Sequence, residues 1–280
     1  MSATLASAAP ITATTRIQRN RAPMVAAALL GTLLLGAALA PLLAPYAMDA
    51  LDLANRRAAP SASHWFGTDE LGRDVLTRVL YGARVSLAIG LVSALVSAAI
   101  GAAVGSIAGY AGRLADDVLM RITDAMLAIP RLPLLMIAAA VLQPGVPMLV
   151  LLVGLAGWME TARVVRAEVL SLAARDFVSA ARAIGASPAR VVLRHVLPGV
   201  LPAAAVATTL AVGRGILLES ALSFFGVGVQ PPTASWGNML YQAQTTMTSE
   251  PWLAIFPGAM IFLTVLACNA VGDAIGAQRS

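Results

Sequence analysis

Three long stretches of this sequence contain no charged residue, and they decide the class of fold. They run from Ala22 to Met48, from Val85 to Gly112 and from Leu132 to Met159. A helix needs about 20 mostly apolar residues to cross a bilayer, so each stretch is long enough. Because 59% of the chain is hydrophobic and 12% is charged, against about 25% charged in an average soluble domain, most apolar side chains must face lipid or other helices.

We therefore expect an all-α integral membrane protein with six transmembrane helices. Gln143, Pro144 and Gly145 divide the third stretch, because Pro and Gly together mark a turn. The expected helices are 22–48, 85–112, 124–142, 146–163, 196–222 and 252–271. In the second helix a small residue recurs at every fourth position, which predicts a face for close helix packing: Ser93, Ser97, Gly101, Gly105 and Gly109.

The first stretch has an alternative interpretation as a cleaved signal peptide. Arg16, Arg19 and Arg21 precede it, and residues 38–40 resemble a cleavage site. The apolar stretch is longer than the core of a normal signal peptide, which favours a transmembrane helix.

The arginines predict the orientation. They gather in segments 1–21, 110–123, 160–195 and 272–280, and segment 223–251 has none. The positive-inside rule then places both termini in the cytoplasm. The expected parts are a cytoplasmic tail (1–21), a first transmembrane helix with a periplasmic loop (22–80), a five-helix core (81–275) that contains a cytoplasmic loop (164–197), and a second cytoplasmic tail (276–280).

The net charge of +5 does not indicate nucleic-acid binding, because the arginines flank apolar runs and aromatic residues make up 5% of the chain. Cys268 lies in an apolar run and is expected to be an ordinary helix residue. The two histidines, His64 and His195, have no further ligand at metal-site spacing, so we predict no metal site.

The loop 164–197 is long, charged and organised as two short helices. Asp176 is the expected N-cap of the first. One apolar face follows from the i, i+3, i+4, i+7 spacing of Phe177, Ala180, Ala181 and Ile184.

Gly185 is expected to end this first helix, because a left-handed C′ position favours glycine. Ser187 and Pro188 begin a second helix that contains Arg194 and His195, and the chain restarts into the membrane at Leu197 and Pro198. Spacing alone leaves two roles open: docking into a groove of a soluble partner, or lying on the membrane surface.

The loop resembles the EAA loop of bacterial ABC importer permeases, on the residues Ala180, Ala181, Gly185 and Pro198. In that family the loop docks onto ATP-hydrolysing subunits, so the resemblance implies a cytoplasmic coupling loop of the kind found in type I importers. Ser179 departs from the family's usual Glu. A Glu there would complete a capping box, which Ser179 does only weakly.

Further segments over about residues 20–275 resemble the "C" type permease of dipeptide, oligopeptide and nickel importers: 64–76, 81–87, 190–198, 219–226, 230–232 and 235–237. The resemblance implies a homologous second permease, two ATPase subunits and a periplasmic solute-binding protein in a bacterial inner membrane. The sequence has no Lys to serve a phosphate-binding loop, so ATP and magnesium belong on the partner ATPase subunits and no cofactor is expected here.

The expected periplasmic loop, residues 44–80, holds the longest of these matches, with the motif residues Gly67, Thr68, Asp69, Gly72, Arg73 and Asp74. We expect it to end in a short amphipathic helix at 75–80. His64 is expected to be solvated there or, as an alternative, to contact the solute-binding protein.

Two charges lie in or near the fifth expected helix, Arg214 and Glu219. A charge at membrane depth is costly and tends to face protein or water. Both residues are candidates to line the solute pathway or to contact the partner permease. The alternative puts Glu219 at the periplasmic end and pairs Arg214 with another helix; Arg131 is expected to be interfacial.

The sequence supports two other classes of function less well than an importer permease. A secondary transporter usually shows inverted repeats and intramembrane charges, and an intramembrane hydrolase needs a serine or metal constellation. For the solute, peptides come first, then nickel complexes, with glutathione as a further option.

Overall fold

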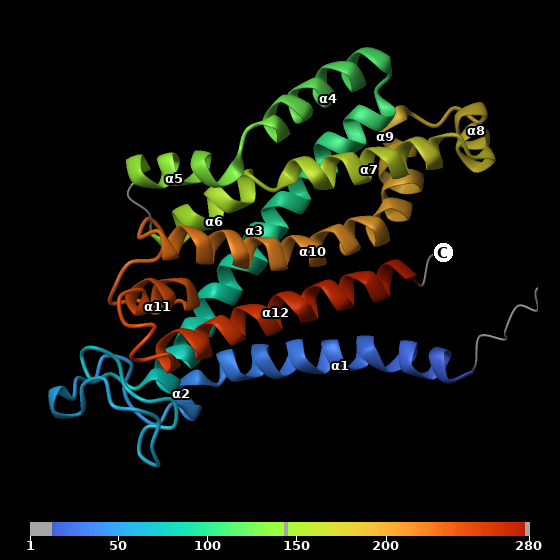
Figure 1. Ribbon diagram of the computed structural model, residues 1–280. Helices are drawn as coiled ribbons and strands as arrows, with labels where there is room; N and C mark the ends of the chain where they lie inside the picture. The colour runs from blue at the N-terminus through green and yellow to red at the C-terminus, as the bar shows by residue number, and fades with distance from the viewer. Residues whose placement is uncertain (1–12, 143–144, 278–280) are drawn as a thin grey trace, which may run out of the picture.

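The computed structural model describes residues 13–142 and 145–277. Helices lie side by side in one layer, in the order α1 (Ala13–Ala38), α12 (Trp252–Ala277), α10 (Leu197–Phe224), α7 (Trp158–Ala173) and α4 (Arg113–Ala128) (Figure 1). The longest helix, α3 (Val75–Tyr110), crosses this layer diagonally and packs against α7 and α10.

Shorter helices complete the chain: α2 (Ala40–Leu43), a 3₁₀ turn (Leu53–Asn55), α5 (Arg131–Leu142), α6 (Val146–Leu155), α8 (Asp176–Ala183), α9 (Pro188–Val191), a π-helical segment (Val192–Val196) and α11 (Trp236–Ala243). Over the described ranges the only strand-like pairing is an isolated bridge between Thr68 and Asp74. The expectation of an all-α protein is confirmed.

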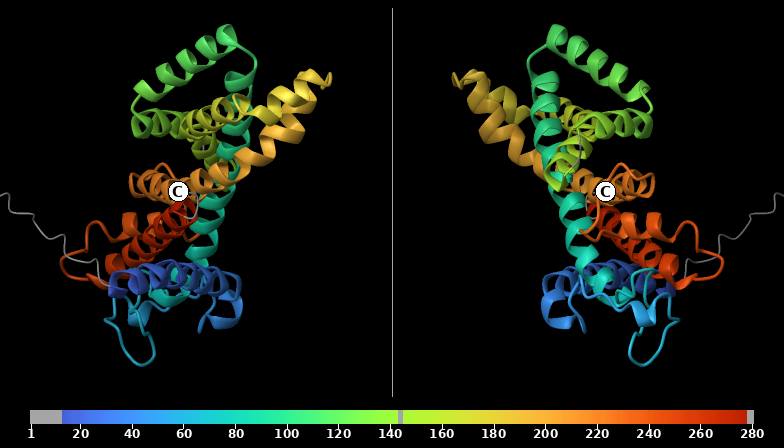
Figure 2. Two further views of the ribbon diagram at one scale, coloured as in Figure 1. Left: turned by 90° about the vertical axis from the view of Figure 1, so that its right-hand side faces the viewer. Right: turned by 90° about the vertical axis from the view of Figure 1, so that its left-hand side faces the viewer.

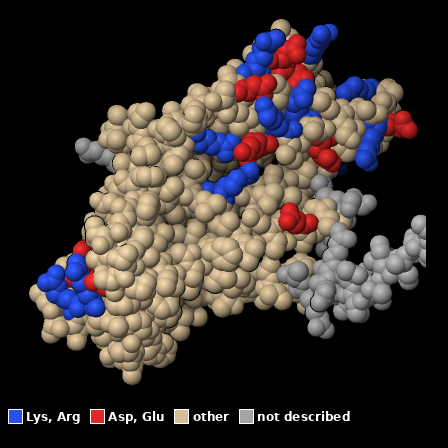
Figure 3. Space-filling model, in the orientation of Figure 1, with Lys and Arg blue, Asp and Glu red and all other residues tan. Residues whose placement is uncertain are grey.

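The turned views show α8 and α9 projecting from the helix layer (Figure 2). This pair of helices lies on the same side of the molecule as the start of α1 and the end of α12, whereas the loop before α3 lies at the opposite end (Figure 1). Charged side chains gather mainly at these two ends, and the band between them is mostly uncharged (Figure 3).

Three helices are long and apolar enough to cross a membrane: Val75–Tyr110, Pro188–Phe224 and Trp252–Ala277. They correspond to the second, fifth and sixth expected helices. The second begins earlier than expected, because the amphipathic segment 75–80 forms the first turns of α3. Asp74 caps it by accepting a hydrogen bond from the backbone of Thr77 at 2.8 Å.

The third and fourth expected helices are wrong as single rods, because both are broken pairs. α4 and α5 meet at 83°, and α6 and α7 meet at 42°. The first break falls at Pro130, which disfavours helical backbone in the residue before it. The second falls at Ala156 and Gly157. Gln143 and Pro144 lie outside the described residues, but a break between α5 and α6 is present, with Gly145 as the N-cap of α6.

The first expected helix, 22–48, is also divided, into α1 and α2. α1 begins inside the expected tail 1–21, and α12 continues into the expected tail 276–280. The apolar part of α1, Pro23–Ala38, is shorter than the three spans above.

The expected stripe of small residues in α3 is confirmed as a packing face. Ser93, Ser97, Gly101, Gly105 and Gly109 are all buried. Ser97 donates a hydrogen bond to the backbone oxygen of Gly154 at 2.7 Å. A Cβ built on Gly109 would lie 2.8 Å from Val169, so the missing side chains let α7 approach α3 closely.

Much apolar surface remains uncovered on the helices. Leu35, Ile137 and Phe262 are 63%, 67% and 64% exposed. A soluble protein rarely leaves so much apolar surface open. The exposed faces therefore suit lipid and other membrane helices.

Candidate functional site

The helix α8 is closed by local hydrogen bonds at its C-terminal end, and its N-terminal end has no side-chain cap. Its N-cap is Arg175, and Asp176 lies in the first turn, so the expectation that Asp176 caps the helix is wrong. An acidic residue in the first turn still complements the helix dipole. At the other end Gly185 has φ +83°. The backbone N–H groups of Ala186 and Gly185 donate to Ala181 and Arg182 at 3.1 and 3.0 Å, which is a Schellman motif. The left-handed glycine that ends the helix is as the sequence predicted.

The helix α9 begins as expected and then departs from expectation. The Ser187 hydroxyl accepts a hydrogen bond from the backbone of Arg190, and Pro188 is the first helical residue. The chain does not restart at Leu197 and Pro198, because α9, the π-helical segment and α10 form one continuous path. Pro198 has no N–H to donate, and its ring crowds the carbonyl group four residues earlier. The wider turn of the π-helical segment just before it makes room for this ring.

The side of this two-helix unit (residues 176–191) that faces α7 forms a small apolar core. Val178 and Val191 are fully buried and cluster with Val165 and Val169 of α7. Ala181 is also buried, so the expected exposed face is wrong at that position, and Val178 was missed. Arg182 stacks over the ring of Tyr110 at 5.0 Å from its centroid. The unit is therefore attached firmly to α7 and α3.

The outer side of the unit is a groove of about 730 Å³. Phe177 and Ile184, 44% and 87% exposed, give it an apolar wall. Its other lining residues are Ala180, Ala181, Gly185, Ala186, Arg190, Arg194 and His195. Ser179 is exposed but outside the groove, and Leu197 and Pro198 lie in the first turn of α10. A groove that combines apolar and basic side chains suits an amphipathic helix with acidic residues on its polar side.

Arg214 belongs to an ion-pair triad at the level of the helix breaks. Its guanidinium contacts Glu160 of α7, and Arg131 of α5 donates to the other oxygen of Glu160 at 2.7 Å. The three side chains are partly exposed, by 42%, 34% and 23% for Arg214, Glu160 and Arg131. Arg214 is thus paired with another helix and still reaches the surface.

Glu219 is fully buried in α10, so in this conformation it neither lines a pathway nor contacts a partner. Its carboxylate accepts hydrogen bonds from Ser86 of α3 at 3.1 Å and from Ser223 at 2.8 Å. Ser86 accepts a hydrogen bond from the backbone of Trp236, at the start of α11. Glu219 therefore joins three helices.

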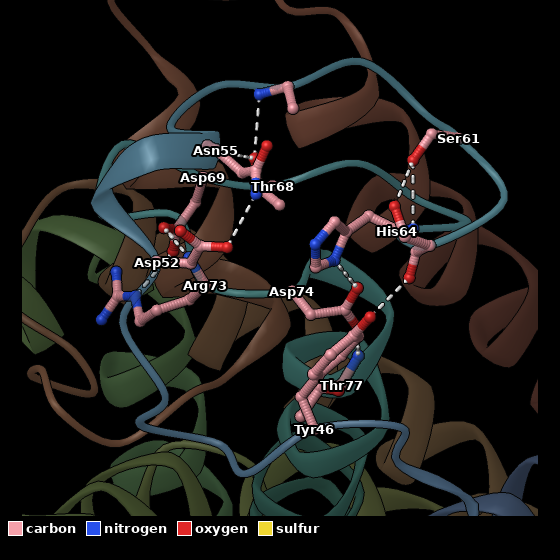
Figure 4. A network of polar contacts seen from close by, with 12 residues as sticks. Tyr46, Asp52, Asn55, Ser61, His64, Thr68, Asp69, Arg73, Asp74 and Thr77 are labelled. Atoms are coloured by element: carbon pink, nitrogen blue, oxygen red, sulfur yellow. Dashed lines mark hydrogen bonds and ion pairs between the residues drawn. The ribbon is translucent and has the colours of Figure 1, made fainter.

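The loop residues 44–74 form a compact turn rather than an open site. Asp69 accepts a hydrogen bond from Arg73 at 2.7 Å, and Thr68 donates one to the backbone oxygen of Asn55 (Figure 4). Gly67 and Gly72 have φ of +76° and +74°. A Cβ on Gly72 would lie 1.8 Å from the backbone oxygen of Asp52, so only glycine fits. The pKa of Asp52 is lowered, chiefly by the hydrogen bond from Asn55.

His64 is buried, so the expectation of a solvated loop histidine is wrong. Its Nδ1 lies 3.0 Å from Asp74, and its ring stacks on Tyr46 (Figure 4). The other oxygen of Asp74 caps α3. One carboxylate thus fastens the loop to the first turn of the longest helix.

Replacing Asp74 with alanine is expected to lower the free energy of unfolding by about 2–3 kcal/mol, the sum of a lost N-cap and a lost buried hydrogen bond. Thermal unfolding of the purified protein in detergent measures it. Asp52→Ala is the matched control, because Asp52 caps only the exposed 3₁₀ turn. Equal effects of the two substitutions would contradict this role of Asp74.

Metal chemistry finds no support in residues 13–142 and 145–277, where no group of three or more His, Cys, Asp or Glu side chains could hold an ion. Cys268 is buried and unpaired with another cysteine.

Two family models match this chain. Residues 101–278 match the binding-protein-dependent transport system inner membrane component, and residues 12–60 match the N-terminal TM domain of oligopeptide transport permease C. The chain belongs to this permease family. The first match contains the two-helix unit, its groove and the whole Arg131–Glu160–Arg214 triad.

Three relatives are similar in sequence to this permease over nearly its whole length. A protein named as a peptide permease of Brucella suis is 40% identical over 93% of this chain and 87% of its own. The glutathione transport system permease protein GsiD of Escherichia coli is 41% identical, over 93% and 86%. The oligopeptide transport system permease protein OppC of Bacillus subtilis is 36% identical, over 93% and 85%.

Sequence reasoning missed Glu160 and gave Arg131 no role. Both lie just after a helix break, at the starts of α7 and α5. The signal was present in the sequence, because a charge beside a proline or glycine inside an apolar stretch marks a broken helix that faces protein or water.

Proposed function

We propose that this permease forms half of the translocation pathway of an ATP-driven ABC importer for di- and oligopeptides. The observation that carries the proposal is the pair of family matches, which cover residues 12–60 and 101–278. Relatives named as peptide, dipeptide and oligopeptide permeases support the substrate class. The chain itself would perform no covalent chemistry, and ATP with magnesium would bind on separate ATPase subunits.

The proposed topology has six crossings in a bacterial inner membrane. Three long helices and two bent pairs supply five of them, and α1 with its apolar part Pro23–Ala38 supplies the sixth. The two-helix unit and both ends of the described chain share one side (Figure 1). The arginine distribution favours the cytoplasm for that side.

The proposed partners are a homologous second permease, two ATPase subunits and a periplasmic solute-binding protein. The groove on α8 and α9 suits the ATPase contact, because it combines exposed apolar residues with basic ones at the proposed cytoplasmic end. The loop before α3 suits the solute-binding protein, since it lies at the other end and exposes Trp65 by 69%.

The mechanism follows from how the two-helix unit is attached. The apolar core of the unit packs against α7, and α9 continues without interruption into α10. The unit is therefore expected to move as a rigid body together with these two helices. Closure of the ATPase dimer on ATP binding would move this unit, and α7 and α10 would move with it. The pathway would then open outward to receive solute and return after hydrolysis.

Glutathione is the second candidate solute. The relative GsiD, 41% identical to this chain, is named for glutathione transport. Glutathione is itself a small peptide, so the same pathway chemistry would serve both solutes.

Replacing Ala180 with tryptophan is expected to lower solute-stimulated ATPase activity of the reconstituted complex at least about tenfold, because a bulky side chain fills the groove. Ala180 is exposed, so the unit keeps its own core. A tenfold loss corresponds to about 1.4 kcal/mol of coupling.

The matched control is Ala183→Trp, on the same helix but outside the groove. It should leave ATPase activity near that of the wild type. Import without any ATPase subunit, or normal coupling in the Ala180 variant, would refute the proposed coupling role.

A further inference from the structure

The triad of Arg131, Glu160 and Arg214 carries an unbalanced positive charge. One carboxylate serves two guanidinium groups, each through a single nitrogen. An arginine has five N–H donors, so both groups keep further donors for another acceptor. Arg214 is the most exposed of the three, at 42%. The triad thus presents a surface cation with free hydrogen-bonding capacity.

The depth of the triad excludes a lipid-facing position. Arg214 lies 17 residues after the start of α10 and 10 residues before its end, which is about 26 Å and about 15 Å along the helix. Because the hydrocarbon core is about 30 Å thick, this point is well inside the membrane. Exposed charges at such depth face water or protein.

The side chains of the triad come from three helices, α5, α7 and α10, that meet at this level. Arg131 starts α5 after the 83° break, and Glu160 lies in the first turn of α7 after the 42° break. A small cavity of about 20 Å³ between Arg131, Arg214, Ser93 and Ser97 has room for about one water molecule. Polar groups and interrupted helices at one depth are typical of a solute pathway through a membrane protein.

We propose that Arg131 and Arg214 bind the terminal carboxylate of the solute as it passes through the permease, and that Glu160 holds the two cations in place. The inference rests on the proposed import of peptides and deepens it. A guanidinium matches a carboxylate through two parallel hydrogen bonds. Glu160 reduces the repulsion between the arginines but leaves one net positive charge for the incoming anion.

The carboxylate is a logical group for such a site to recognise. Peptides differ in their side chains, whereas every unmodified peptide ends in a carboxylate. A pathway that binds this group accepts many sequences without a pocket for each side chain. The same contact would serve glutathione, which also carries carboxylates.

The test compares uptake of a free peptide with uptake of the same peptide amidated at its C-terminus, in proteoliposomes with the complete complex and its solute-binding protein. In Arg214→Gln we expect free-peptide uptake to fall about tenfold, which corresponds to about 1.4 kcal/mol, and amidated-peptide uptake to stay near wild type. Since the solute-binding protein is the same throughout, its own preference cancels between variants. Arg214→Lys keeps the charge but loses the paired donors of the guanidinium, so it should retain only part of the preference.

Arg163→Gln is the matched control, because Arg163 forms an exposed ion pair with Asp124 between α7 and α4. It should leave the uptake of both peptides unchanged. Normal free-peptide uptake in Arg214→Gln overturns the carboxylate site and leaves the importer intact. An equal fall for both peptides also overturns it and indicates a contact with the partner permease or a structural role. If the wild-type complex imports neither peptide, the proposed function itself fails.

Discussion

Replacing Gly105 with alanine is expected to lower the free energy of unfolding by about 3 kcal/mol, at the upper end for overpacked interiors. A Cβ at this position would lie 2.5 Å from the backbone oxygen of Ala162 and 2.8 Å from Cβ of Val165. A backbone oxygen in α7 cannot rotate away as a flexible side chain can, so the two helices must separate. Thermal unfolding in detergent and the yield of folded protein from membranes measure the effect.

The matched control is Gly36→Ala in α1, where nothing lies within 4 Å of the added carbon. That change should be neutral or should stabilise the helix by about 0.5–1 kcal/mol, because alanine loses less backbone entropy than glycine. If both variants unfold alike, close contact between α3 and α7 does not support the fold.

The membrane helices were predictable because their signal is local. A run of apolar residues without charge is sufficient to indicate a crossing, and Val85–Gly112 lies almost wholly within α3. The small-residue stripe was also readable, since residues four apart share one face of a helix. The start of α3 was missed because an amphipathic segment that faces protein can continue straight into an apolar one.

The broken helices could not be predicted from apolarity alone. The stretch 124–142 satisfies a length criterion whether the chain bends or not. What decides the bend is the backbone at Ile129, just before Pro130, and the packing that lets α4 fold back over α7. The partner of Arg214 was equally hidden, because Glu160 is 54 residues away in sequence and reaches it only through the fold.

In the two-helix unit, capping rules predicted the helix ends but not which side chains are buried. Gly185 and Ser187 were predicted correctly because their roles depend on a few neighbouring backbone groups. Asp176 was misplaced by one position, within the ordinary error of helix ends. Val178 was missed because its burial depends on α7, which a helical spacing rule does not include.

Replacing Glu219 with leucine is expected to lower the free energy of unfolding by about 2–4 kcal/mol, because buried hydroxyl donors lose their acceptor. Leucine has nearly the size of glutamate, so the effect is polar rather than steric. The loss should spread beyond the site. Ser86 also holds the backbone of Trp236, and Ser223 holds that of Val229 at 3.0 Å. Faster hydrogen exchange over residues 225–243, together with a lower unfolding temperature, is the expected signature.

Glu219→Gln separates hydrogen bonding from packing and from charge. Its amide oxygen can still accept from Ser86 or Ser223, so we expect less than half of the leucine effect and near-normal exchange over residues 225–243. Equal destabilisation by leucine and glutamine would mean that both carboxylate oxygens are needed as acceptors. A leucine variant as stable as the wild type would contradict the role of Glu219 as the junction of α3, α10 and α11. It would mean that apolar packing around Trp236, which is fully buried, holds this end of the molecule by itself.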